Sequence, residues 1–193
     1  TADRDFATDQ YAYNIVLPIG TRTLPGISYT KGDKWQTVVL DTMNIDTYAA
    51  TIALDVTAEN GNSTRYTLNF AVEKSSVDTL ANIYLTINDI DESLALSGSN
   101  YTADAAFAGS TETYHLTWQV GTRDIVTINY DKGDAYQTVE IVRQLTTLTD
   151  TATIKVTAEN GNERIYNIYS QLLLSTVDTL KSVFFADMPF DAS

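Results

Sequence analysis

Cysteine is absent from this 193-residue chain, and histidine occurs only once, at position 115. Without thiols the chain can form neither disulfide bonds nor zinc–thiolate sites, and it has no cysteine nucleophile. One imidazole is too few for a histidine-based zinc site, and nothing in the sequence supports His115 as part of a Ser-His-Asp triad. We therefore expect no catalytic residues, no enzymatic activity and no cofactor.

Basic residues are also scarce, because 12 lysines and arginines stand against 25 acidic residues and leave a net charge of −13. Nucleic acids and anionic membranes bind clustered basic side chains, so neither is an expected partner. No apolar run approaches the roughly 18 residues of a membrane-spanning helix, which predicts no membrane insertion of this segment. The acidity indicates solubility, with cation binding as the alternative.

What the chain does contain is a repeated heptapeptide, Val-Thr-Ala-Glu-Asn-Gly-Asn, at positions 56–62 and 156–162. In each copy an alternating apolar and polar segment leads into Asn-Gly, and a second such segment follows. Asn-Gly tolerates positive φ at both central positions of a type I′ turn, which matches the twist of the flanking strands. Each copy therefore predicts a β-hairpin with this turn.

The repetition extends over a period of about 100 residues, which is too long for a solenoid and is the size of one immunoglobulin-like sandwich. Matching segments lie at positions 20–22 and 121–123, 31–33 and 132–134, 36–38 and 137–139, and 77–80 and 177–180. We therefore predict an all-β fold of two tandem immunoglobulin-like antiparallel β-sandwiches.

Alternation of apolar and polar residues predicts the individual strands. In the first repeat they span residues 13–19, 25–29, 36–40, 51–58 and 65–72, and Phe6 is expected to fill the core. In the second repeat they span residues 80–87, 113–120, 125–130, 137–143, 151–158 and 164–174, and a long connection over 88–110 contains a further short strand.

The repeat boundaries predict three segments. Residues 1–75 form the first sandwich, residues 76–175 the second, and residues 176–193 the start of a truncated third repeat. Thr1 aligns with Thr102, so the first sandwich is expected to lack its first strand, the counterpart of residues 80–87.

The residues around the second hairpin resemble a known family. The run Thr-Ile-Lys-Val-Thr-Ala-Glu-Asn-Gly-Asn at 153–162, followed by Tyr166, is similar to the cadherin-like β-sandwich domain of bacterial surface proteins, and so is the Leu-x-x-Ile opening at 80–83. The resemblance implies a spacer or adhesion module in a cell-surface or secreted bacterial protein. Its partners would be neighbouring domains of the same polypeptide, a glycan or another surface protein.

Aromatic residues provide the candidate ligand-binding site. Trp118 shares its parity with Tyr114 and Leu116, so it is expected in the core. Strict alternation from Val38 instead places Trp35 outward beside the turn at 31–33, and Tyr136 is its counterpart. Exposed aromatic rings at one position in both repeats predict carbohydrate binding. The alternative is that a bulge turns these rings inward, or that they only cover the end of the sandwich.

The acidic stretch that contains Asp89, Asp91 and Glu92 is a candidate site for Ca²⁺. Calcium requires six to eight oxygen ligands, so three local carboxylates suffice only if other loops contribute, and a solvated acidic loop is the alternative. His115 has the parity opposite to Trp118 and is expected to point away from the core.

The two ends of the chain are complementary. Residues 177–185 repeat the start of the segment at 77–85, and the body of the first repeat lacks that segment. An unpaired strand and an unpaired sheet edge favour head-to-tail strand exchange, in which residues 177–185 add to the first unit of a neighbouring molecule. The alternative is that this tail packs along the second unit.

Overall fold

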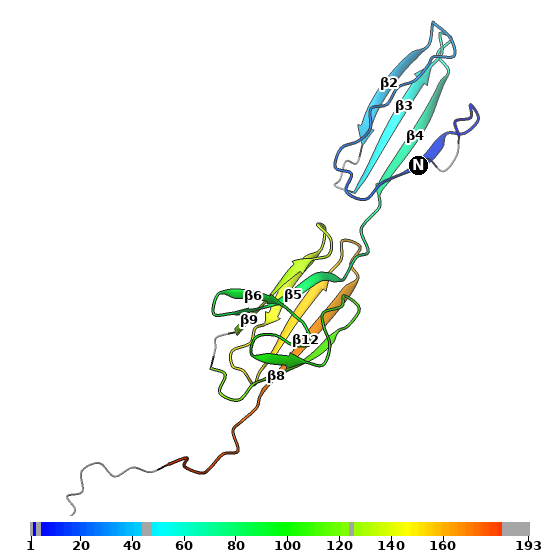
Figure 1. Cartoon of the computed structure of the whole chain (residues 1–193). Coiled ribbons are helices and arrows are strands. Elements are labelled where there is room, and N and C mark those ends of the chain that lie inside the picture. Colours follow the sequence, from blue (N-terminus) through cyan, green and yellow to red (C-terminus); the bar gives the residue numbers. More distant parts are fainter. Residues whose placement is uncertain (1, 3–4, 44–47, 124–125, 183–193) are drawn as a thin grey trace, which may run out of the picture. The chain divides into compact units, whose positions relative to one another are not determined.

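The computed structural model describes residues 2, 5–43, 48–123 and 126–182 (Figure 1), and every regular element among them is a β-strand. The strands are β1 (Ala12–Leu17), β2 (Thr37–Met43), β3 (Ala49–Thr57), β4 (Ser63–Val72), β5 (Leu80–Ile87), β6 (Ile90–Ser93), β7 (Tyr101–Ala103), β8 (Thr113–Trp118), β9 (Val126–Lys132), β10 (Thr138–Arg143), β11 (Thr151–Thr157) and β12 (Glu163–Leu172). The predicted all-β class is therefore confirmed.

The chain divides into two compact units. The first comprises Thr1–Asp78 with Gly133–Thr138 and Val156–Glu163, and the second comprises Thr79–Lys132, Val139–Lys155 and Arg164–Ser193. Two turn regions of the second sequence repeat thus belong to the first unit. The domain borders expected at 75/76 and 175/176 stay predictions.

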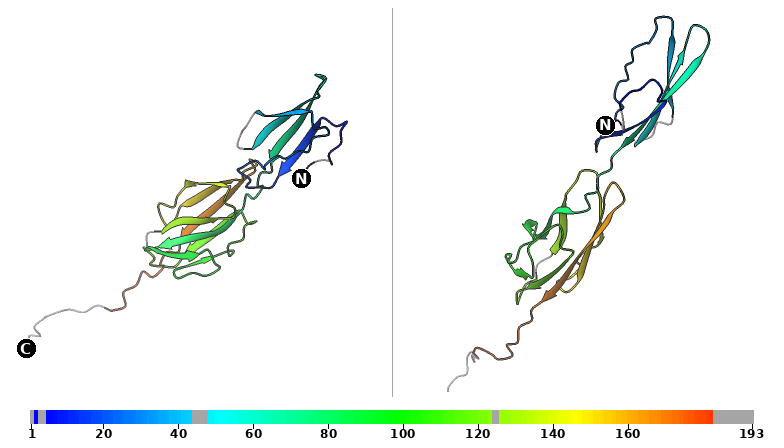
Figure 2. Two further views of the ribbon diagram at one scale, coloured as in Figure 1. Left: turned by 90° about the horizontal axis from the view of Figure 1, so that it is seen from above. Right: turned by 90° about the vertical axis from the view of Figure 1, so that its right-hand side faces the viewer.

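In the first unit, the strands within residues 12–72 form one sheet in the order β1-β4-β3-β2 (Figure 2). Alternating apolar residues of these strands bury one side of the sheet, where Ala50, Ile52, Leu54 and Phe70 form a small core. The sheet was expected to be antiparallel throughout, but β1 runs parallel to β4. Parallel partners are joined by long connections, and local hairpin signals in a sequence do not reveal them.

The second unit contains a five-stranded sheet, β10-β11-β12-β8-β7, and a three-stranded sheet, β6-β5-β9. Both sheets contribute fully buried side chains, among them Trp118 and Ile154 from the first and Ile83 and Ile128 from the second. This arrangement is consistent with a β-sandwich, and it places Trp118 in the core as predicted. Here too one pair is parallel, between β12 and β8.

Both predicted hairpins are present, but their turns differ from the expected type. Gly61 and Gly161 have φ of 90° and 94°, whereas the asparagines before them are not among the described non-glycine residues with positive φ. The amide of Gly61 donates to the carbonyl of Ala58, and the amide of Ala58 donates to the carbonyl of Asn62. This is a three-residue loop that ends in a left-handed glycine, rather than a type I′ turn.

A two-residue turn with positive φ at both positions occurs elsewhere, at Asn88 and Asp89. It joins β5 to β6, and Ile87 pairs with Ile90 across it. Asn and Asp adopt the left-handed region more readily than other residues with a Cβ, which explains a type I′ turn without glycine. The connection expected over 88–110 therefore contains two short strands, β6 and β7, where one was predicted.

The strand predicted at 25–29 is absent, because this described segment has no regular structure. Its counterpart in the second repeat is β9, which is a strand from Val126 onward and pairs with β5 in an antiparallel ladder. Residue 125, also predicted in that strand, lies outside the described residues. A strand requires a hydrogen-bonding neighbour, and no described strand of the first unit occupies the place that β5 holds beside β9.

Candidate functional site

The segment that leads from the first repeat into the second is held by hydrogen bonds at Ser75. Ser75 donates its backbone N–H to Glu159 Oε2 at 2.9 Å and its hydroxyl to Asp134 Oδ2 at 3.0 Å. In return its carbonyl accepts the amide of Asn160 at 3.0 Å. The N–H of Ser75 lowers the pKa of Glu159, which holds this carboxylate in its charged form. Ser75 is consequently buried although it is polar.

Two further hydrogen bonds guide the chain from Ser75 into β5. Gln137 Nε2 donates to the carbonyl of Val77 at 2.9 Å, and the amide of Leu80 donates to the Tyr166 hydroxyl at 3.1 Å. From there Leu80, Ile83 and other inward residues of β5 are buried in the core.

The corresponding face of the first repeat is open. One hollow of about 460 Å³ is lined by Asp33, Trp35, Gln36, Ala58, Glu59 and Asn60, which are the counterparts of the residues around Ser75. A second hollow of about 580 Å³ has an apolar lining that includes Phe6, Ile27, Tyr29, Val56, Tyr66 and Leu68. Gln36 lines both hollows, and we refer to the two hollows together as the open groove.

Gln36 makes one of the two side-chain contacts that its counterpart Gln137 makes. Its Oε1 accepts the amide of Gly32 at 3.1 Å, as Gln137 Oε1 accepts the amide of Gly133 at 3.1 Å. Gln137 also uses its Nε2 to hold Val77. The Nε2 of Gln36 donates to no acceptor among the described residues.

Tyr66 shows the same relation to Tyr166. Each hydroxyl donates to a backbone carbonyl at an equivalent position, Thr8 at 3.2 Å for Tyr66 and Gly109 at 2.7 Å for Tyr166. The Tyr166 oxygen also accepts the amide of Leu80. No N–H among the described residues donates to the oxygen of Tyr66, a residue that lines the groove.

The lining of the open groove is more exposed than its counterpart. Ile128, Val156 and Tyr166 are fully buried, whereas the equivalent side chains are half-buried, namely Ile27, Val56 and Tyr66. Phe6 was expected to fill the core, but it is 69% exposed. It packs on Tyr13 with ring centroids 5.9 Å apart, as Phe107 packs on Tyr114, and it lines the second hollow.

The two candidate aromatic residues differ from the core tryptophan as predicted. Trp35 is 61% exposed and Tyr136 is 40% exposed, whereas Trp118 is fully buried. The amides of Trp35 and Tyr136 donate to the aspartates of their turns, Asp33 at 2.7 Å and Asp134 at 2.6 Å, which fixes both aromatics at equivalent positions. Carbohydrate binding by these rings stays a prediction.

The acidic stretch proposed for Ca²⁺ follows the β5–β6 turn. Asp91 accepts the Thr86 hydroxyl at 2.5 Å, and Glu92 accepts the Ser99 amide at 3.1 Å. Asp89 lies in the turn itself. Within the described part of the chain, no three His, Cys, Asp or Glu side chains gather in a group that could hold a metal ion.

His115 is exposed, in agreement with its parity, but it is not unsupported. Its Nδ1 lies 2.7 Å from Asp104 Oδ2, its backbone amide donates to Asp104 Oδ1, and its ring stacks on Tyr169. The N–H of His115 lowers the pKa of Asp104. Asp104 lies in the loop after β7, and sequence spacing alone did not indicate this pair.

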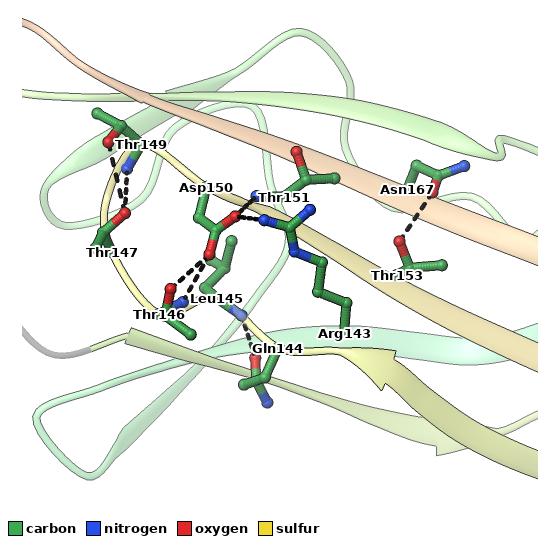
Figure 3. Close-up of polar contacts among 10 residues, drawn as sticks. All are labelled: Arg143, Gln144, Leu145, Thr146, Thr147, Thr149, Asp150, Thr151, Thr153 and Asn167. Atoms are coloured by element: carbon green, nitrogen blue, oxygen red, sulfur yellow. Dashed lines mark hydrogen bonds and ion pairs between the residues drawn. The ribbon is translucent and has the colours of Figure 1, made fainter.

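Asp150 is the centre of a polar network in the second unit (Figure 3). It accepts the Thr146 hydroxyl at 2.6 Å and the Thr151 amide at 2.7 Å, and it pairs with Arg143. The Thr146 hydroxyl is the main cause that lowers the pKa of Asp150 to about 2. Every described partner of the Asp150 side chain belongs to the loop between β10 and β11 or to the adjoining strand ends, so the network shapes this loop.

Neither a scan against models of protein families nor a search of curated proteins finds a match to this chain. The resemblance to cadherin-like domains therefore stays a prediction. Among the described residues no helix is long and apolar enough to span a membrane. The chemistry that the geometry favours is backbone recognition. The open groove combines an apolar floor with an amide donor of Gln36 and a hydroxyl acceptor of Tyr66, neither of which is used in that role by any described residue.

Proposed function

We propose that this chain is a non-catalytic pair of tandem immunoglobulin-like β-sandwich repeats from a bacterial cell-surface or secreted protein, where it acts as a spacer or adhesion module. One observation carries the proposal. The contacts that recur from the first repeat to the second are those that hold a β-unit together, and the residues that receive the preceding segment in the second repeat have counterparts in the first.

The recurrence extends to individual atoms. The Tyr13 hydroxyl bonds the amide and carbonyl of Ala7, both at 2.9 Å, and the Tyr114 hydroxyl bonds those of Ala108 at 3.0 and 2.9 Å. Ala2 forms a bridge with Ile15, as β7 does with β8 at the equivalent positions. These recurring contacts hold the fold together in both repeats, which supports a structural role. The resemblance to cadherin-like domains of exported proteins supports a location at the cell surface or outside the cell.

A spacer resists extension, so pulling single molecules by their two ends tests the proposal. We expect two separate unfolding events, and the second repeat should release about 36 nm of chain, at ~3.6 Å for each of about 100 residues. A chain that extends without any resisting event would contradict a spacer role.

Carbohydrate binding is the second candidate function, and the exposure of Trp35 favours it. This indole lies at a hollow that Asp33, Glu59 and Asn60 also line, so a stacking ring and hydrogen-bonding groups occur together. Lys34 Nζ lies 4.8 Å from the centre of the same ring. A glycan array with the wild-type chain and with Trp35→Ala tests this candidate, which requires binding that the variant loses.

A further inference from the structure

The open groove has a defined ligand chemistry, because the second repeat displays the same groove in its filled form. There the occupant is an extended segment that begins with Ser75, passes Val77 and Leu80, and continues as β5. The first repeat has the equivalent residues, and Gln36 Oε1 accepts the amide of Gly32 at 3.1 Å as Gln137 Oε1 accepts that of Gly133. This correspondence favours, as the ligand, an extended peptide that reproduces the residue pattern of this segment.

Each group that holds Ser75, Val77 or Leu80 in the second repeat has a counterpart in the open groove. Asp33, Glu59 and Asn60 line the hollow that corresponds to the surroundings of Ser75. The free Nε2 of Gln36 corresponds to the group that holds the carbonyl of Val77, and the hydroxyl oxygen of Tyr66 corresponds to the group that accepts the amide of Leu80. Three separate receptors thus select for one register of one kind of peptide.

The same pattern occurs once more in this sequence, near its end. Residues 175–180 read Ser-Thr-Val-Asp-Thr-Leu, whereas residues 75–80 read Ser-Ser-Val-Asp-Thr-Leu. Their apolar side chains are not packed, since Val177 is 76% exposed and Leu180 is 81% exposed. The alternative that this tail packs along the second unit does not hold for these two residues. Residues 183–185 are Val-Phe-Phe and lie outside the described residues.

The state of the two grooves indicates which one this segment can enter. Residues 80–87 already occupy the groove of the second repeat, where they pair with β9. Residues 175–180 carry the same residue pattern, so the open groove of a first repeat is the one that can receive them.

We propose that residues 175–185 of one molecule add as a strand to the open groove of a second copy. Ser175 enters the hollow lined by Asp33, Glu59 and Asn60. The carbonyl of Val177 accepts Gln36 Nε2, and the amide of Leu180 donates to the Tyr66 hydroxyl. Beyond this point the segment runs antiparallel to residues 25–31, as β5 runs to β9.

This contact is heterologous, because the donor and acceptor surfaces of a molecule are different. Each copy that donates its tail keeps its own groove open, so addition continues head to tail. The inference goes beyond a spacer role and does not depend on it, since a spacer can remain monomeric.

Light scattering of the 193-residue protein over a wide concentration range tests the proposal. We expect the mean mass to rise with concentration from the 21.3 kDa monomer past the dimer. Leu180→Asp places a charge where the groove is apolar and should keep the protein monomeric. Gln36→Glu should weaken assembly at least tenfold, since it keeps the Oε1 acceptor for Gly32 but replaces the amide donor with a charge.

Leu174→Asp is the matched control, because Leu174 is 74% exposed and corresponds to Lys74, whose Nζ lies over the Tyr48 ring at 4.4 Å. This variant should assemble as the wild type does. A synthetic peptide of residues 174–187 should dissolve the assemblies and protect Trp35 from acrylamide quenching, and a scrambled peptide should do neither.

Two results would overturn the proposal. One is a protein that stays monomeric at every concentration, including one that folds its tail back into its own groove. The other is assembly that Leu174→Asp abolishes as fully as Leu180→Asp, because that would indicate nonspecific apolar association. Protection of Trp35 by a glycan but not by the peptide would assign the hollow to carbohydrate instead.

Discussion

At the scale of single residues, the glycine in each hairpin loop has a conformational role that its neighbours do not share. Gly61 has φ of 90°, and a Cβ placed there would meet no atom within 4 Å. The only penalty of a side chain at this position is therefore backbone strain, which isolates the effect of the left-handed conformation.

Gly61→Val should destabilise the first unit by about 1–2 kcal/mol, the cost of the left-handed region for a residue with a Cβ. Gly26→Val is the matched control, since Gly26 also has open space around its Cβ position but no positive φ. Thermal unfolding of both variants measures the difference. Equal midpoints would show that the turn does not require glycine.

The carboxylate of Asp150 makes the free energy of unfolding depend on pH in the acid range. Its folded-state pKa is about 2 against an ordinary value of 3.8, so its contribution is present above about pH 4 and is lost as the pH falls through 2. Asp150→Asn should remove this part of the pH dependence between pH 4 and 2 while the protein remains folded at pH 7. Urea unfolding at several pH values checks it, and an unchanged acid slope in the variant would contradict the network in Figure 3.

At the scale of elements, local sequence predicted most strands, but not those whose formation depends on a distant partner. Alternation of apolar residues located β5 from Leu80 to Ile87 with the bounds that the structure has. The same signal predicted a strand at 25–29 that is absent, although its counterpart β9 is regular. Alternation reports which face can be buried, whereas a strand also requires a neighbour for its hydrogen bonds.

The candidate site was predictable to a similar extent. Parity correctly placed Trp118 inside, because this residue alternates with its neighbours within β8. Trp35 is exposed as predicted, but it lies in the turn before β2, where its amide bonds Asp33, so strand alternation is not the reason. The receptors Gln36 and Tyr66 were not identified, since their importance appears only when the filled contacts of Gln137 and Tyr166 are seen. The only hint in the sequence was that glutamine recurs at the matching positions 36 and 137.

Hydrogen exchange should separate the two equivalent segments. In dilute protein, amides in residues 25–31 should exchange quickly because no ladder protects them, and amides of β9 should be protected by their pairing with β5. Peptide 174–187 should slow exchange at 25–31 and leave β9 unchanged. Strong protection of 25–31 in dilute protein without peptide would contradict an open groove.

At the scale of the whole molecule, donor and acceptor belong to one repeating pattern. The filled groove of the second repeat specifies the register of the empty one, because Ile83 pairs with Tyr130 in the β5–β9 ladder. The corresponding residues are Val183 in the tail and Tyr29 in the groove. Strand addition therefore predicts that these two positions meet between molecules and not merely that molecules associate.

Disulfide trapping tests this claim most directly, since the wild-type chain has no cysteine. Paired residues in an antiparallel ladder have Cα atoms about 4.5–5.5 Å apart, within the range of a disulfide bond. Tyr29→Cys protein mixed with mass-tagged Val183→Cys protein should give a cross-linked heterodimer under mild oxidation. The heterodimer should disappear when Leu180→Asp is added to the donor. Val39→Cys, at another exposed position of the first unit, serves as the acceptor control. Cross-linking at Tyr29→Cys that is no faster than at Val39→Cys would contradict strand addition in this register.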